Sequence, residues 1–147
     1  MKKHLLWLSV VIVMVFLTSF QQQVKEVFNP EKPVTKNISL AMYAGGNYSS
    51  AIYDASAAQL QVIVYKVRGN KYAAVWEKTF DAMELKKIPA CSNALSQQVS
   101  ISNVFDKKEQ LVVVYHLTYN SKGSVLETQN GAYVSKGKKA DKLYISI

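Results

Sequence analysis

A chain of 147 residues, 49% of them hydrophobic, is large enough for one ordinary domain with its own core, so folding requires neither a metal nor a disulfide. A disulfide within the chain is excluded because Cys91 is the only cysteine. The net charge of +8 comes from scattered lysines, and Arg68 is the only arginine. Because arginine is the residue that makes bidentate contacts to phosphate and guanine, this charge does not indicate nucleic-acid binding.

The N-terminal segment has the pattern of an export signal. Lys2 and Lys3 give a basic start, residues 5–17 are almost uniformly apolar, and Ser19 is a small residue behind them. A helix over the apolar run rises only about 20 Å, short of the roughly 30 Å that a stable membrane span must cross. We therefore predict a secretory signal peptide over residues 1–19 and a periplasmic, cell-surface or extracellular location. The alternative is an uncleaved N-terminal anchor, which would then be the membrane contact of the chain.

The first strands of the domain are indicated by a period of two. Residues 34–42 place Ile38, Leu40 and Met42 on one face and polar or small residues on the other, as a half-buried strand requires. Residues 48–53 are expected to form a short second strand.

The best hairpin signal follows. Residues 60–68 are rich in β-branched side chains and apolar on both faces, which predicts a strand in the middle of a sheet. Residues 71–80 are also strand-like, and Gly69 and Asn70 between the two segments tolerate the positive φ of a tight turn. We expect these two strands to pair with each other.

The strand pattern is interrupted at residues 81–96. Asp81 followed by Glu84 resembles a capping box, and Leu85 begins a short apolar stripe before Pro89. These features predict a short helix of about two turns.

Strand patterns resume after this interruption. Further strands are predicted at residues 98–102, 111–119, 124–129, 132–135 and 143–147. The apolar density of residues 111–119 predicts another central strand. The strand at residues 143–147 offers an edge for self-association.

Seven to nine short antiparallel strands with one helical crossover predict an all-β chain folded as a single β-sandwich. The alternative is an α+β domain in which a helix at residues 81–96 packs on an open antiparallel sheet. Residues 20–33, with Pro30 and Pro33, form a polar leader, and residues 34–147 form the domain.

Groups with catalytic or metal-binding chemistry are few. His116 shares a predicted strand face with Val112 and Val114, which is typical of a hydrogen-bonded structural histidine. Cys91 lies in a small, fairly apolar segment, which predicts a buried or half-buried thiol, and an intermolecular disulfide is the alternative. One cysteine and one such histidine cannot make a structural zinc site, and the dispersed acidic residues do not indicate a calcium site. We therefore predict no catalytic residues, no metal and no cofactor.

Aromatic residues are the one enrichment, with nine tyrosines in the chain. Tyr72, Trp76 and Phe80 have the same strand parity, and Tyr48 lies beside a glycine turn. Rings on a sheet face can stack on sugars or form a protein interface, which makes Trp76, Tyr72 and Tyr48 the candidate ligand-binding residues. The competing interpretation is that Trp76 packs in the core.

An export signal, good folding patterns and no reactive constellation favour a non-catalytic exported module that binds an envelope protein or another envelope component. The alternative is a carbohydrate-binding module that uses exposed aromatic residues around Trp76, with a glycan as its ligand. A third hypothesis is a hydrolase whose site forms only in the folded chain.

Overall fold

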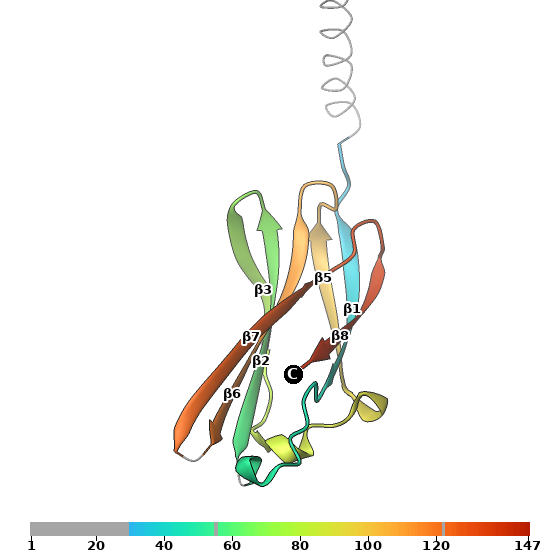
Figure 1. The fold of residues 1–147 in the computed structure, drawn as a ribbon. Coiled ribbons are helices and arrows are strands. Elements are labelled where there is room, and N and C mark those ends of the chain that lie inside the picture. The colour runs from blue at the N-terminus through green and yellow to red at the C-terminus, as the bar shows by residue number, and fades with distance from the viewer. Residues whose placement is uncertain (1–29, 55, 122) are drawn as a thin grey trace, which may run out of the picture. The chain divides into compact units, whose positions relative to one another are not determined.

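The computed structural model describes residues 30–54, 56–121 and 123–147, and Pro33–Ile147 form one compact unit. The predicted signal peptide at residues 1–19 lies outside the described residues. Eight strands in two sheets make this unit all-β and consistent with a β-sandwich, as predicted (Figure 1).

The smaller sheet has three strands and the larger has five. The smaller sheet has the order β5 (Leu95–Val104), β1 (Val34–Tyr43), β8 (Ala140–Ser146). The larger sheet has the order β3 (Lys71–Thr79), β2 (Ala57–Arg68), β6 (Gln110–Ser121), β7 (Ser124–Tyr133), and the short β4 (Met83–Glu84) also pairs with β2. The predicted central strands are therefore β2 and β6, which lie side by side.

The core forms between the inner faces of the two sheets. Leu40 in β1 and Val64 and Val113 in the larger sheet are fully buried. The alternation predicted for the first strand is confirmed, because its apolar residues belong to this core. The predicted hairpin is confirmed as well: β2 and β3 pair antiparallel, and Gly69 in the turn has a φ of 56°.

Three predictions about the strands are wrong. Residues 48–53 do not form a strand but lead into a 3-10 turn, η1 (Ala51–Tyr53), because Asn47 Oδ1 accepts a hydrogen bond from Ser49 N at 3.0 Å and turns the chain. Residues 124–129 and 132–135 are not two strands, since β7 runs without a break to Tyr133. One strand pair, β1 with β8, is parallel, because the chain crosses between the sheets before β8 instead of turning back in a hairpin.

The helix predicted at residues 81–96 is also absent. The segment contains β4 and two 3-10 turns, η2 (Leu85–Lys87) and η3 (Cys91–Asn93). Leu85 is buried, and its backbone N–H donates to Ser56 O at 3.0 Å. Pairing with a neighbouring segment thus replaces the helical hydrogen bonds that the sequence pattern favours.

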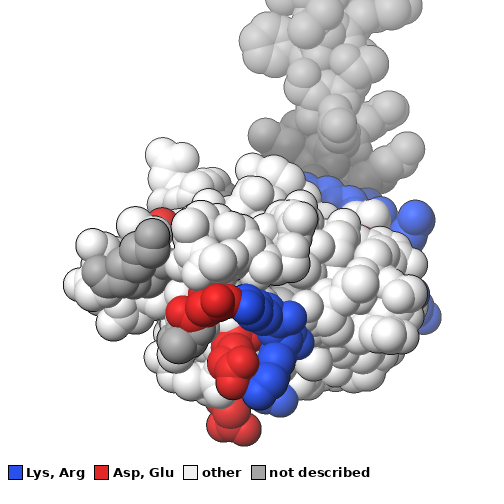
Figure 2. Space-filling model, turned by 60° about the horizontal axis from the view of Figure 1, so that its bottom comes forward, with Lys and Arg blue, Asp and Glu red and all other residues white. Residues whose placement is uncertain are grey.

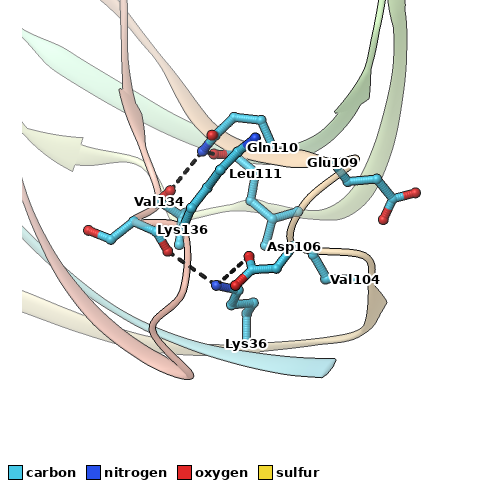
Figure 3. A pocket seen from close by; sticks show the side chains of 9 residues that line it. Lys36, Val104, Asp106, Glu109, Gln110, Leu111, Val134 and Lys136 are labelled. Atoms are coloured by element: carbon cyan, nitrogen blue, oxygen red, sulfur yellow. Dashed lines mark hydrogen bonds and ion pairs between the residues drawn. The ribbon is translucent and has the colours of Figure 1, made fainter. Parts of the chain in front are cut away.

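A buried lysine ties the smaller sheet to two loops of the domain (Figure 3). Lys36 lies on the core side of β1 with 3% of its side chain exposed, and its Nζ is 2.6 Å from Asp106 Oδ1. The same ammonium group donates to Ser135 O at 3.2 Å and Lys138 O at 2.6 Å. Asp106 Oδ2 accepts from Gly137 N at 2.6 Å. The ammonium group of Lys36 thus finds its partners within the chain, and the cluster ties β1 to the loops that carry Asp106 and Ser135.

Candidate functional site

A β-bulge places two of the predicted ligand-binding residues on opposite faces of the larger sheet. Val64 in β2 pairs with Trp76, but the next residue, Tyr65, pairs with Ala74, so Val75 is an extra residue in β3. One inserted residue reverses the side-chain alternation of a strand. Trp76 therefore points to the core, whereas Tyr72 points outward, and the shared parity predicted for these residues is wrong.

Burial agrees with this separation. Trp76 is half-buried and packs against the core, whereas Tyr72 has 70% of its surface exposed. The interpretation of Trp76 as a core-packing residue is thus confirmed, and a sugar-stacking surface that joins Trp76 to Tyr72 is not formed.

These positions predict a clear contrast in stability. Trp76→Ala should lower the free energy of unfolding by about 2 kcal/mol, since truncation of a fully buried Trp costs about 3–5 kcal/mol and this ring is half-buried. Tyr72→Ala should change it by less than about 0.5 kcal/mol, because the ring is exposed. Urea unfolding monitored by circular dichroism measures both values. Equal losses in the two variants would contradict the assignment of the two faces.

Tyr48, the third predicted residue, lies elsewhere, in a cluster of tyrosine rings. Its ring meets that of Tyr53 edge to face with 5.3 Å between centroids, and Tyr53 in turn is 6.5 Å from Tyr119. Burial, followed by the neighbouring tyrosines, raises the pKa of Tyr48. Tyr48 packs against the core, so this hydroxyl-bearing ring closes one end of the core and does not join Tyr72.

The two isolated reactive side chains are also far apart in the architecture. His116 lies on the outer face of the larger sheet, where Nδ1 is 3.1 Å from Glu127 Oε1, as expected of a hydrogen-bonded structural histidine. Cys91 lies in η3 beside the outer face of the smaller sheet and is exposed. The prediction of a buried thiol is wrong, because the chain leaves the sheet after Pro89 and the 3-10 turn at Cys91 buries none of its residues.

The structure gathers a different set of aromatic and apolar side chains on the outer face of the larger sheet. Strand register brings together Ile63, Tyr65 and Val67 of β2, Tyr72 of β3, Val112 and Val114 of β6, and Gly131 and Tyr133 of β7. We call this set the tyrosine face. Tyr72 and Tyr133 have 70% and 73% of their surface exposed. Tyr65, Val112 and Tyr133 are neighbours in one row, which puts the first and last about 10 Å apart.

Gly131 makes the β7 side of the tyrosine face shallow. A Cβ at this position would lie 3.0 Å from Val113 O and 3.6 Å from Val114 Cγ2, so a larger residue would push against β6. The Val114 side chain fills the space that Gly131 leaves. The surface next to the ring of Tyr133 is therefore low and apolar.

The charge on this side of the molecule differs from that of the chain as a whole. The chain carries a net charge of +8, yet none of the residues that pair across the outer face of the larger sheet is a lysine or arginine. The polar half of this face instead holds Glu77, which accepts from Gln61 Nε2 at 2.7 Å, and Glu127, which pairs with His116. The tyrosine face is therefore bordered by carboxylates.

Other surfaces of the domain are less distinctive. A groove of about 460 Å³ beside the smaller sheet is lined by Cys91, Lys142 and Tyr144 among others, and it is largely polar. The end of the domain seen in Figure 2 carries a cluster of mixed charge, in which Lys86 pairs with Asp54 and Lys87 is 2.8 Å from Glu84. Paired opposite charges of this kind do not select a ligand of one sign.

Two further properties concern residues 30–54, 56–121 and 123–147. Within these ranges, no three His, Cys, Asp or Glu side chains meet in a group that could hold a metal ion. No helix in the same part of the chain has the length and apolar character to cross a membrane.

The tyrosine face was missed by sequence reasoning because its members come from four strands. The available signal was the apolar second face of the central strands, on which Val112 and Val114 share parity with His116. Comparison of the chain with protein-family models, with curated proteins and with solved structures finds no match. The geometry of the site is therefore the basis for a functional proposal.

Proposed function

We propose that this protein is an exported, non-catalytic β-sandwich module that binds an envelope protein through its tyrosine face. The observation that carries the proposal is an uncovered apolar sheet face with two strongly exposed tyrosines and no cation, on a chain that is otherwise rich in lysine. Soluble proteins rarely leave a contiguous apolar patch uncovered unless it binds something. The basic start and apolar run of residues 1–19 support export.

The composition of the face suggests the chemistry of its partner. Tyrosine is enriched at the centres of protein interfaces, where a ring supplies apolar area at low entropic cost and a hydroxyl supplies a hydrogen bond. Glu77 and Glu127 at the border favour a partner with apolar side chains flanked by lysine or arginine. A glycan that stacks on Tyr72 and Tyr133 is the alternative ligand.

The test compares the same photo-crosslinking amino acid at two exposed tyrosine positions. Tyr72 lies on the tyrosine face, whereas Tyr144, 58% exposed, lies on the outer face of the smaller sheet and serves as the matched control. The full chain with the crosslinker at either position is exported in cells, irradiated and analysed by mass spectrometry. We expect one protein adduct at Tyr72 and none of the same partner at Tyr144.

Binding to the purified partner then completes the test. Tyr72→Asp should weaken it at least about tenfold, because a carboxylate replaces one of the two strongly exposed rings of the tyrosine face, and Tyr144→Asp should leave it unchanged. Equal labelling at both positions, or no adduct at either, would refute the proposal. If the wild-type chain binds to cell-wall glycan and Tyr72→Asp abolishes that binding, the ligand of the tyrosine face is a sugar and not a protein.

A further inference from the structure

The strand β7 forms an edge of the larger sheet and pairs with β6 alone (Figure 1). Its ladder with β6 runs from Ser124 to Tyr133 without a register shift. Almost every residue of the strand is exposed, including Val125 at 70% and Tyr133 at 73%. A long, regular and exposed edge of this kind is a template for another strand.

Two other strand edges of the domain, those of β3 and β5, carry the usual protections. The edge strand β3 contains the bulge at Val75 and two lysines. The edge of β5 is bridged to the larger sheet, since Lys78 Nζ donates to Gln97 Oε1 at 2.6 Å and Lys66 Nζ donates to Asn103 O at 2.7 Å. By contrast, Glu127 is the single charged residue of β7, which contains no lysine, proline or bulge.

The hydrogen bonds around β7 show which backbone groups face away from β6. Val134 N, just after the strand, donates to Leu111 O at 3.0 Å. The backbone N–H and C=O groups of the even-numbered residues therefore point toward β6. Gly131 N instead donates to the side-chain Oδ1 of the preceding Asn130 at 2.8 Å. By alternation, the odd-numbered residues direct their backbone groups out of the sheet, and their side chains lie on the outer face.

We propose that two copies of this chain pair through β7, antiparallel and with the two-fold axis at Gln129. In this register Val125 of each copy lies opposite Tyr133 of the other, and Glu127 lies opposite Gly131. Aromatic residues opposite β-branched residues are favourable cross-strand pairs. A register centred on Glu127 would instead place two carboxylates face to face, which is unfavourable.

The proposed pairing closes on itself. The two copies use the same edge, so the larger sheets join into one continuous sheet and no β7 edge remains. Pairing through β7 therefore adds no third copy. Tyr133 and Gly131 belong to both surfaces, but this inference rests on the backbone edge of β7 and not on the proposed partner. Gln129 lies outside the tyrosine face and Tyr72 lies on the opposite edge strand, so variants at these two positions test the two proposals separately.

The experiment uses the full chain, purified after export, in sedimentation velocity over a concentration series with a reductant, because the exposed thiol of Cys91 can crosslink copies. We expect a monomer–dimer equilibrium for the wild type. Gln129→Lys and Gln129→Glu should each raise the dissociation constant about tenfold or more, because like charges meet at the two-fold axis. An equimolar mixture of the two variants should restore dimers that weaken as salt is added.

Gln59→Lys is the matched control, since Gln59 is exposed on the outer face of β2, two strands from the edge. It should dimerise like the wild type. A wild type that stays monomeric throughout the series overturns the proposal. So does equal weakening by Gln129→Lys and Gln59→Lys, or a mixture of the two charge variants that does not associate.

Discussion

Asp106→Ala should lower the free energy of unfolding by about 2–4 kcal/mol. The substitution leaves the ammonium group of Lys36, whose side chain is 3% exposed, without its carboxylate partner. Loss of one member of a fully buried ion pair costs about 3–5 kcal/mol, and the 22% exposure of Asp106 lets solvent reduce that loss. Denaturant unfolding measures the effect.

A double-mutant cycle separates the ion pair from other contacts of the two side chains. Lys36→Met removes the charge from the core side of β1, and the double variant Lys36→Met/Asp106→Ala leaves no unpaired ammonium group. The double variant should therefore be much less destabilised than the sum of the two single variants. Additive losses would contradict the coupling of Lys36 to Asp106.

The cluster of Lys36 and Asp106 also makes the free energy of unfolding depend on pH. Burial raises the pKa of Asp106, but hydrogen bonds from Lys36 and Gly137 and the charges of Lys36 and Lys136 outweigh it, so the pKa lies below its ordinary value. The backbone N–H of Ser135 is the main cause that lowers the pKa of Asp141. Depressed carboxyl pKa values add stability above the ordinary pKa of about 4 and lose it as pH falls further. Asp106→Asn should therefore flatten the decline in stability that the wild type shows below about pH 4.

Leu40→Ala should cost about 3–5 kcal/mol of unfolding free energy. Leu40 lies in β1, the central strand of the smaller sheet, and its side chain is completely buried against the core. Removal of a buried leucine side chain loses its transfer free energy and leaves a cavity that a close-packed sandwich fills poorly.

Tyr144→Ala is the control for Leu40→Ala on the same sheet. Tyr144 lies in the neighbouring strand β8, but on the outer face and 58% exposed. Its truncation should change stability by less than about 0.5 kcal/mol. A loss at Leu40 no larger than the loss at Tyr144 would show that the smaller sheet does not depend on its buried face.

Local patterns in the chain were sufficient to predict the class of fold. Apolar density on both faces identified β2 and β6 as central strands, because β-branched and aromatic side chains pack well between neighbouring strands of a sheet. Gly69 and Asn70 identified the β2–β3 hairpin, since a tight turn needs residues that accept a positive φ. These features depend on neighbours in sequence and can be read without the tertiary structure.

The candidate site required the folded chain. The bulge at Val75, which separates Tyr72 from Trp76, depends on how β3 pairs with β2 and has no signal in the alternation of β3 itself. Tyr65 and Tyr133 become neighbours of one row only through β6, and the sequence does not state which strands pair. Aromatic content indicated a binding surface, but register decided its members.

The sequence by itself determined an all-β chain with β2 and β6 at its centre, since period and composition are local properties. The tertiary structure decided the rest. Lys36 faces the core, against its polarity, because Asp106 and two backbone carbonyl groups from distant loops meet its ammonium group. In the same way, β8 runs parallel to β1 and β7 is left as an open edge because strand order depends on contacts between segments far apart in the chain.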